Sequence, residues 1–306
     1  MEKTQHHTPT ENAGVVIRHL AGEYLDAQGG SPKTAVIRRQ ALTHLQRFLD
    51  AQGRERLADI TAADLEAWRL DLLQRNFAPA SLEVFCRSVR QFFNWLEQGQ
   101  RLFINPAAGF IVPKPPRPLL PVLTPEQVQR LLSQPDPDTA TGTRDRALLA
   151  VVYATGITAQ ELRTLHCQDA SREAVKVRGR NPRTLPMDAH AAEALARYLD
   201  QARPALLGEN KTPALWLTNR GQALSHDALQ QVFSRHSKAA GLGYISANAL
   251  RRACAVHRWQ AGAHPLELQL LLGHASLHTL CQYLRATTAE LFNPYKETRH
   301  ETAAIA

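Results

Sequence analysis

Five prolines stand within the ten residues 112–121, which read Val-Pro-Lys-Pro-Pro-Arg-Pro-Leu-Leu-Pro. Proline fixes the backbone φ angle and has no amide hydrogen to donate, so this run cannot form a helix interior or a central strand. A stiff, extended and cationic connection is the conformation that remains. The segment therefore predicts a linker, and it divides the 306 residues into two parts that are each large enough for a core.

The predicted organisation has two folded parts and a tail at each end. Residues 13–110 are expected to form a helical domain, residues 111–121 the linker, and residues 122–298 a second domain. Residues 1–12 are polar and aperiodic and are expected to form a tail, as are residues 299–306.

Before the linker, apolar residues recur three and four positions apart, as on the buried face of a helix. Thr61 and Asp64 have the spacing of a helix cap, and Pro79 is placed for a first helical turn. This part predicts four helices and no strands.

After the linker, Thr124 and Pro125 begin a capped helix. Residues 175–187 alternate in polarity and contain the turn-forming pair Asn181-Pro182, which predicts a short hairpin. The pattern from residue 190 to about 291 is helical again. The predicted fold class is mainly α with a small β-sheet (α+β), in two domains.

The chain is basic, with 36 Lys and Arg against 28 Asp and Glu, a formal net charge of +8 and a pI near 9.6. This balance suits a polyanion that releases counterions on binding. No stretch reaches the ~18 apolar residues that span a bilayer, and the first residues lack the apolar core of a signal peptide. We expect a cytoplasmic protein with no membrane partner.

The four cysteines are scattered and include no CxxC pair. They are expected to be reduced thiols, most of them buried. We expect no metal site and no cofactor.

The C-terminal quarter carries the most specific pattern. Arg251 follows Asn248 by three residues, His274 ends the run Leu-Gly-His, and Tyr283 stands nine residues after His274. The pattern resembles the end of the tyrosine recombinase (phage integrase) family, which reads His-x-x-Arg, Leu-Gly-His and a nucleophilic Tyr nine residues later. The resemblance covers about residues 14–290 and includes the Asn105-Pro106-Ala107 turn.

This resemblance implies a helical core-binding (SAM-like) domain before the linker and a catalytic domain after it. Members of the family cleave DNA by attack of a tyrosine on a phosphodiester, leaving a 3′-phosphotyrosyl bond. Two arginines and a His or Trp hold the phosphate oxygens, a hairpin lysine protonates the leaving 5′ oxygen, and a second His or Lys assists proton transfer. The division of labour suits phosphoryl chemistry, which is mostly positioning and charge stabilisation.

Three positions depart from the family pattern. Thr158 stands where the first arginine is expected, and a hydroxyl cannot make a bidentate charged contact with phosphate. Thr158 and Glu161 instead have capping-box spacing. Arg180 replaces the hairpin lysine and is a poor acid, and Asn248 replaces a histidine and cannot shuttle a proton.

The retained positions are Arg251, His274 and Tyr283, and Arg251 is the best candidate for a direct phosphate contact. Structural alternatives stay open for each: a salt-bridged arginine, a structural histidine and a packing tyrosine. Arg163 and Arg252 are near in sequence, but Arg252 lies about 100° around a helix from Arg251 and should not enter the same pocket. The sequence offers no replacement for the missing arginine.

Cationic residues recur on segments that line DNA in the resembled family, although each one could also be a solvated surface charge. The candidate DNA-binding residues are Arg38, Arg39, Arg47, Arg87, Arg90, Lys114, Arg117, Arg178, Arg180, Arg183, Arg235, Lys238, Arg251 and Arg252.

The sequence favours a site-specific double-stranded DNA-binding protein, a pseudoenzyme that has lost most or all strand cleavage. It would act at the nucleoid as a regulator, an accessory recombination subunit or a replication-initiation factor of a plasmid or mobile element. The alternative is an active recombinase or integrase that uses Tyr283 in a rearranged site, and a third reading is a scaffold that binds only protein. Expected partners are DNA with inverted-repeat sites, further copies of the chain, and an active recombinase or replication proteins.

Overall fold

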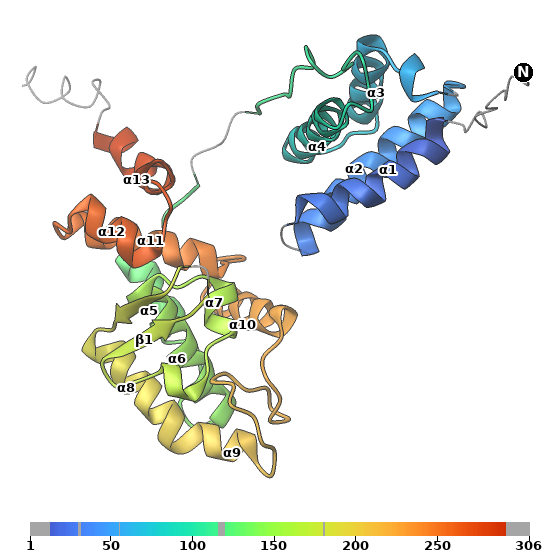
Figure 1. Cartoon of the computed structure of the whole chain (residues 1–306). Coiled ribbons are helices and arrows are strands. Elements are labelled where there is room, and N and C mark those ends of the chain that lie inside the picture. Colours follow the sequence, from blue (N-terminus) through green and yellow to red (C-terminus); the bar gives the residue numbers. More distant parts are fainter. Residues whose placement is uncertain (1–12, 30–31, 55, 116–119, 180, 292–306) are drawn as a thin grey trace, which may run out of the picture. The chain divides into compact units, whose positions relative to one another are not determined.

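The computed structural model describes residues 13–29, 32–54, 56–115, 120–179 and 181–291 (Figure 1). The chain divides into two compact units, Met1–Arg117 and Pro118–Ala306, here called unit 1 and unit 2. Residues 111–115 and 120–124 adopt neither helix nor strand. No described helix combines the length and the apolar character needed to cross a lipid bilayer.

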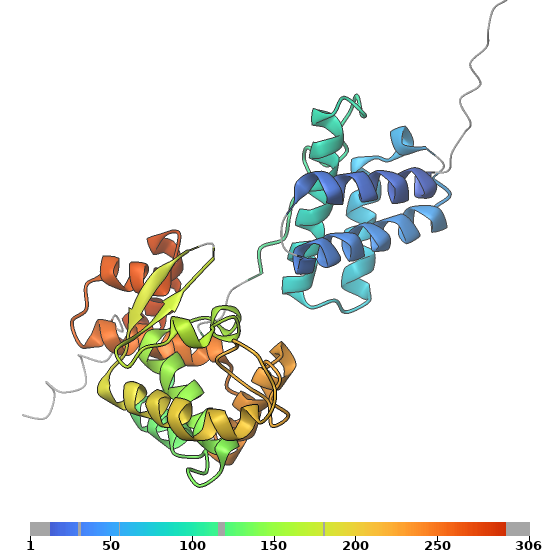
Figure 2. The same cartoon turned by 60° about the horizontal axis from the view of Figure 1, so that its bottom comes forward.

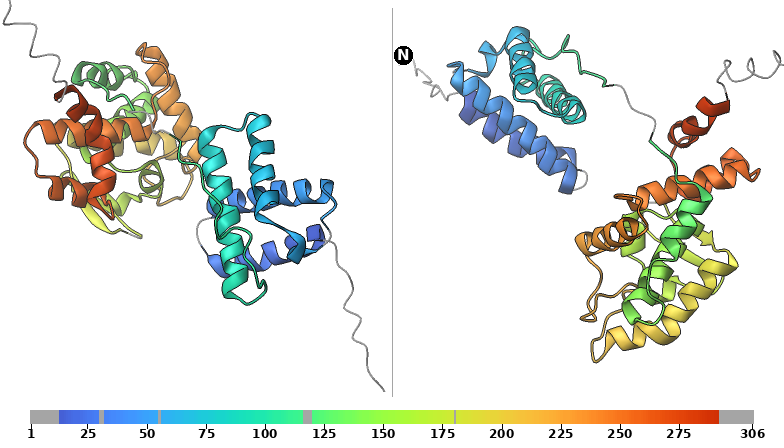
Figure 3. Two further views of the ribbon diagram at one scale, coloured as in Figure 1. Left: turned by 90° about the horizontal axis from the view of Figure 1, so that it is seen from above. Right: turned by 180° about the vertical axis from the view of Figure 1, so that it is seen from behind.

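Unit 1 is built from helices. These are α1 (Ala13–Gln28), α2 (Pro32–Ala51), α3 (Ala62–Gln74) and α4 (Pro79–Gln98), with a 3-10 turn at Leu57–Asp59. α1 and α2 pack along each other (Figures 1 and 3). Thr61 and Asp64 form the predicted capping box at α3, and Pro79 begins α4. The prediction of four helices without strands is confirmed for the described residues.

The core of unit 1 is aromatic. One face of α4 buries Phe92, Phe93 and Leu96, and the Tyr24 ring meets the edge of Phe92 at a centroid distance of 5.5 Å. Trp68 of α3 is fully buried in the same cluster. Fully burying a side chain of this kind contributes about 2 kcal/mol, and aliphatic residues such as Leu42, Leu45 and Leu49 of α2 complete the core.

Unit 2 surrounds one buried helix. Its helices are α5 (Pro125–Leu132), α6 (Ala140–Thr155), α7 (Ala159–Arg163), α8 (Ala189–Arg197), α9 (Arg203–Leu207), α10 (His226–Ala239), α11 (Ala247–Gln260), α12 (Pro265–Leu272) and α13 (Leu277–Leu291). α6 is buried along most of its length, and α8 and α11 pack against it (Figure 3). A 3-10 turn spans Cys167–Asp169, and a π-helical turn, Tyr198–Ala202, joins α8 to α9.

The only sheet of the described residues is an antiparallel hairpin of β1 (Ala174–Val177) and β2 (Arg183–Pro186). Ala174 pairs with Pro186 and Val177 with Arg183. The Asn181 side chain donates a hydrogen bond of 3.0 Å to the Gly273 carbonyl, so the hairpin reaches the end of α12 (Figure 2). The predicted hairpin and the fold class, mainly α with a small sheet, are confirmed.

One stretch of the helical prediction is wrong. Residues 208–225 form a loop with an isolated bridge between Leu217 and Ala223, not a helix. Gly208 and Gly221 have φ of 54° and 70°, and a Cβ on Gly221 would lie 2.7 Å from the Leu207 carbonyl oxygen. The loop is therefore fixed by close backbone approaches that hydropathy does not register.

Candidate active site

The site begins where α6 ends. Gly156 terminates α6 with φ 63°, and its amide donates to the Val152 carbonyl at 2.9 Å. A Cβ on Gly156 would lie 2.6 Å from the Leu272 side chain, so glycine both permits the left-handed turn and lets α12 approach α6.

Thr158 caps α7, as its spacing with Glu161 predicts. Its hydroxyl accepts from the Glu161 amide at 3.2 Å and donates to Glu161 Oε2 at 2.8 Å. The Glu161 carboxylate also accepts from the Thr158 amide at 3.0 Å. Both the donor and an acceptor site of the hydroxyl are engaged within the helix cap.

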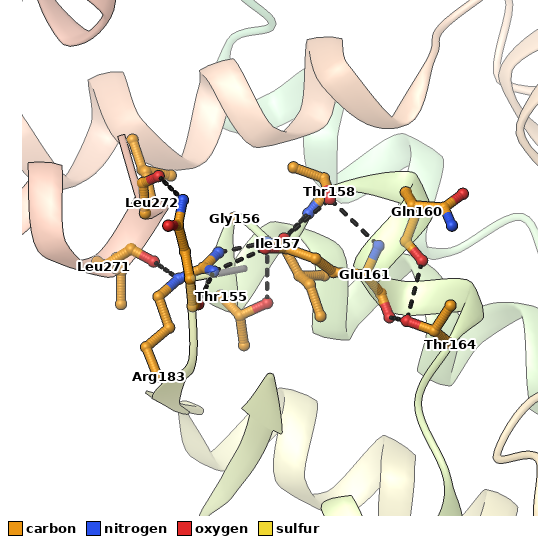
Figure 4. A network of polar contacts seen from close by, with 12 residues as sticks. Thr155, Gly156, Ile157, Thr158, Gln160, Glu161, Thr164, Arg183, Leu271 and Leu272 are labelled. Atoms are coloured by element: carbon orange, nitrogen blue, oxygen red, sulfur yellow. Dashed lines mark hydrogen bonds and ion pairs between the residues drawn. The ribbon is translucent and has the colours of Figure 1, made fainter. Parts of the chain in front are cut away.

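Arg183 reaches the same carboxylate from the start of β2 (Figure 4). Its Nη1 and Nη2 donate to Glu161 Oε1 and Oε2 at 2.7 and 3.2 Å, and its Nε donates to the Leu271 carbonyl at 2.7 Å. Burial raises the pKa of Glu161, but the hydrogen bonds from Arg183 and Thr158 outweigh burial and leave the pKa below its ordinary value. Glu161 is therefore ionised at neutral pH.

Arg251 projects from α11 into the space between α6 and α12. It donates to the Gly156 carbonyl and, at 2.6 Å, to the Leu272 carbonyl. Its side chain is buried, with 3% of the residue exposed, yet no carboxylate of the described residues pairs with it. The last carbonyls of a helix lack partners within the helix and carry partial negative charge, which explains why Arg251 and Arg183 bind the end of α12.

His274 lies beside these arginines, and Tyr283 packs against His274. Their rings meet edge to face, with centroids 5.3 Å apart and planes at 76°. Burial lowers the pKa of His274 to about 4, and the positive charges of Arg251 and Arg183 act in the same direction. Its Nδ1 is buried without a hydrogen-bond partner among the described residues. Tyr283 is partly buried against the cluster formed by α11, α12 and α13.

Two further candidate catalytic positions are Asn248 and Arg180. Asn248 is exposed and, with Ala159, His226 and Tyr244, lines a separate hollow of about 110 Å³. Arg180 lies outside the described residues. The structure thus brings Thr158, Arg251, His274 and Tyr283 into one region, together with Arg183 and Glu161.

Arg252 points away from Arg251, as the helical offset predicts. Its Nε and Nη2 donate to the Pro121 carbonyl at 3.3 and 3.0 Å. Burial lowers the pKa of Arg252, and the neighbouring Tyr283 opposes that shift.

The surface candidates have varied surroundings. Arg38 lies over the Tyr24 ring at 5.8 Å, Arg87 pairs with Glu83, and Arg178 pairs with Asp169 at 2.5 Å. The remaining exposed candidates are Arg39, Arg47, Arg90, Lys114, Arg235 and Lys238, whereas Arg117 lies outside the described residues. Among the described residues, no group of three or more His, Cys, Asp or Glu side chains is arranged to hold a metal ion.

Comparisons with known proteins assign the family. The model of the phage integrase family matches residues 121–290, and that of the phage integrase N-terminal SAM-like domain matches residues 22–100. Tyrosine recombinase XerD of Shewanella oneidensis is 33% identical over 270 residues, covering 87% of this chain and 90% of XerD. The chain belongs to the phage integrase family.

Further members agree with this assignment. Tyrosine recombinase XerC of Roseiflexus sp. is 31% identical and covers 94% of this chain and 92% of its own. Among solved structures, XerH site-specific recombinase bound to a palindromic difH substrate aligns with a TM-score of 0.73 at 18% identity, covering 91% of this chain and 82% of its own. A lambda integrase dimer bound to a COC′ core site aligns with a TM-score of 0.70, also at 18% identity, covering 87% and 94%. These two structures support the fold.

The sequence did not predict that the Arg183 side chain lies beside Glu161 and Gly273 in this protein. It named Arg183 only as a candidate DNA contact and found no second guanidinium for the pocket. A Cβ on Gly273 would lie 2.8 Å from Arg183 Nη1, so the glycine of Leu-Gly-His leaves room for that guanidinium. The tight packing of two segments 90 residues apart is visible only in three dimensions.

Proposed function

We propose that this chain is a site-specific recombinase that cleaves and rejoins double-stranded DNA through Tyr283. The observation that carries the proposal is Arg251, a buried cation without a carboxylate partner among the described residues. Isolated buried charges are strongly disfavoured, and two carbonyl groups compensate a guanidinium only in part. A phosphodiester would supply the missing negative charge, and Arg is well suited to hold it.

The neighbours of Arg251 fit the same chemistry. Attack by the Tyr283 oxygen would form a bond to phosphorus while the bond from phosphorus to the 5′ oxygen breaks. The phenol loses one proton and the leaving 5′ oxygen gains one. Positive charge at the phosphate stabilises the charge that develops on its oxygens during the attack, and Arg251 is placed to supply it. His274 is neutral at neutral pH because its pKa is lowered to about 4, so its ring is a weak base that is suited to hydrogen bonding with a phosphate oxygen or the phenol.

The relatives support cleavage more than the non-cleaving protein that the sequence alone favours. XerD and XerC named above are called tyrosine recombinases, and each matches nearly the whole of this chain. XerH was solved on a palindromic substrate and lambda integrase as a dimer on a core site. By extension, we propose that two or more copies of this chain bind inverted-repeat DNA sites in the cytoplasm.

The test is covalent capture. Duplexes that bind the protein are selected from random sequence, and the recovered site is remade with a nick beside each candidate phosphate, so that the cleaved fragment diffuses away. The wild type is expected to accumulate a protein–DNA adduct that survives denaturation. Tyr283→Phe should bind the same duplex with unchanged affinity and form no adduct. Tight, site-specific binding by a wild type that never forms an adduct would refute the proposal.

One observation favours a second candidate, a DNA-binding protein without cleavage. The Thr158 hydroxyl is held in the α7 cap, and Asn248 lines a hollow with Ala159, His226 and Tyr244 and cannot shuttle a proton. Losing one preorganised donor lowers a rate by roughly 10²–10³, and losing a general acid by roughly 10²–10⁴. In this case Tyr283→Phe would leave the biological role intact. Roles in regulation, accessory recombination or replication initiation, on a plasmid or mobile element, stay predictions.

A further inference from the structure

We infer that Arg183 supplies the second guanidinium of the phosphate pocket, in place of the arginine that Thr158 replaces. The inference rests on the proposed function, because it assigns a new phosphate ligand to that same site. It is carried by where the Arg183 side chain lies relative to Thr158, Gly273 and Arg251.

The first argument is proximity to position 158. Thr158 Oγ1 and Arg183 Nη2 bind the same atom, Glu161 Oε2, at 2.8 and 3.2 Å, so they lie no more than about 6 Å apart. A long side chain at position 158 would therefore place its charged end near the Arg183 guanidinium. The short threonine leaves that region to the arginine that arrives from the hairpin (Figure 4).

The second argument is that the same structural elements fix both arginines. Arg183 Nε donates to the Leu271 carbonyl and Arg251 Nη2 to the next carbonyl, that of Leu272, at 2.7 and 2.6 Å. The Arg183 guanidinium is also seated against Gly273, where a Cβ would lie 2.9 Å from its Cζ. Two guanidinium groups held by consecutive carbonyls are preorganised, which is what stabilisation of a phosphoryl transition state requires.

The third argument is charge. Arg183 and Arg251 each carry one positive charge, Glu161 carries one negative charge, and the lowered pKa of His274 leaves that ring neutral at neutral pH. The four side chains together carry a net charge of about +1, which complements the single negative charge of a phosphodiester. Without Arg183, the remaining charges would cancel.

The fourth argument is donor capacity. A guanidinium has five N–H donors, and Arg183 makes four hydrogen bonds with described residues, to Leu271, Asn181 and both oxygens of Glu161. The bond to the Asn181 carbonyl is 3.1 Å long and exposed, and 11% of the Arg183 side chain is accessible. A phosphate oxygen could accept the remaining N–H or replace the Asn181 carbonyl.

The alternative is that Arg183 merely ties the hairpin to Glu161. These two roles predict different results for the two ends of the ion pair. If Arg183 is only a tie, Arg183→Gln and Glu161→Gln should be equally harmful. If Arg183 binds phosphate, Arg183→Gln should be far worse than Glu161→Gln, because the second change leaves the guanidinium and its charge in place.

The experiment measures adduct formation on the nicked duplex for wild type, Arg183→Gln, Glu161→Gln and the double variant Thr158→Arg/Arg183→Gln. We expect Arg183→Gln to be slower by roughly 10²-fold and Glu161→Gln by less than about tenfold. Arginine at position 158 should restore much of the loss. Arg203→Gln is the matched control, since Arg203 also binds backbone carbonyls, those of Thr212 and Ala214 at 3.0 and 2.7 Å, at a distance from the site. Thermal unfolding of each variant identifies any folding defect. The double variant Glu161→Gln/Arg183→Gln is included because it removes the charge of Arg183 without leaving the Glu161 carboxylate unpaired.

A binding measurement keeps the inference testable even if the wild type does not cleave. Each central phosphate of the selected duplex is replaced in turn by an uncharged methylphosphonate. At one position the replacement should weaken wild-type binding by about tenfold more than it weakens the binding of Arg183→Gln, which keeps only Arg251 at that phosphate. Equal losses in both proteins at every position, or Arg183→Gln and Glu161→Gln equally slow in cleavage, would overturn the role of Arg183. Absence of an adduct from the wild type, with the tenfold coupling still present, would instead overturn only the proposed cleavage.

Discussion

The two units hold their arginines in different ways. In unit 1 several arginines lie at the surface against carboxylates: Arg54 with Asp64 at 2.6 Å, Arg75 with Asp71 at 2.9 Å, Arg101 with Glu23 at 2.5 Å, and Arg87 with Glu83. Unit 2 also contains ion pairs, but Arg251, Arg252 and Arg258 donate instead to backbone carbonyls of Leu272, Pro121 and Ala154. Arg251 is buried with no described carboxylate, whereas the arginines paired in unit 1 are partly exposed.

This difference separates two uses of positive charge. An arginine on carbonyls keeps its full charge in a fixed position, while an arginine on a surface carboxylate has that charge neutralised and screened by salt. We therefore expect unit 2 to supply preorganised charge for chemistry. Unit 1 should supply affinity that depends on salt, through exposed arginines such as Arg39 and Arg47.

The largest expected effect is at Arg251. Arg251→Gln should slow adduct formation by about 10²–10³-fold, since it removes a preorganised charge from the phosphate. It should also lower the free energy of unfolding by about 1–3 kcal/mol, because two buried carbonyls lose a charged donor. Covalent capture and chemical denaturation measure the two effects. A change below threefold in the adduct rate would show that Arg251 does not supply the charge for cleavage, and would contradict the distinction drawn between the arginines of the two units.

The next largest effect is expected at Gly273, which the Arg183 guanidinium contacts. Gly273→Ala should slow adduct formation by roughly tenfold or more, because the new Cβ would lie 2.8 Å from Arg183 Nη1. Gly241→Ala is the matched control: Gly241 has φ 68° against 66° for Gly273, and its added Cβ meets no atom within 4 Å. Both variants carry the left-handed strain of about 1–2 kcal/mol, and only Gly273→Ala displaces the guanidinium. Equal adduct rates in the two variants would show that the contact with Arg183 is irrelevant.

A smaller effect is expected in unit 1. Arg39 and Arg47 are exposed on α2 and line a hollow of about 590 Å³ beside α1. Arg39→Ala/Arg47→Ala should weaken duplex binding by about tenfold at moderate salt and reduce the slope of log affinity against log salt by about two. The rate of cleavage at saturating DNA should not change. An unchanged salt slope would remove these residues from the DNA contact.

The smallest effect is on stability against pH. The pKa of His274 is lowered from about 6.5 to about 4, so the unfolded chain binds more protons between these values. Folding stability should therefore fall as pH decreases from 6.5 towards 4 and be unaffected by this group above 6.5. His274→Gln should flatten that part of the melting-temperature profile by a few degrees. An unchanged profile would mean that His274 is not buried as a neutral ring.

The features predicted best from the sequence are those that depend on residues a few positions apart, such as helix caps and tight turns. The Thr158–Glu161 cap follows from a spacing of three, and the hairpin follows from alternation around Asn181-Pro182. The orientation of Arg252 away from Arg251 follows from the helical period.

The pocket itself was only half predictable. Its C-terminal members were found because a motif keeps them close in sequence. Arg183 joins Glu161 across 22 residues and Leu271 across 88, and nothing local records those contacts. The loop over 208–225 was missed for a similar reason, because close approaches to Gly221 leave no hydropathy pattern.

The bonds between Arg252 and Pro121 give α11 a mechanical role. Pro121 is the last residue of the proline-rich run, and its carbonyl accepts two hydrogen bonds from the residue next to Arg251. We expect a pull on Pro121 to act on α11 through these bonds, one residue away from the buried Arg251. Optical-trap pulling on wild type and Arg252→Gln, with adduct formation as the readout, measures whether cleavage senses that force.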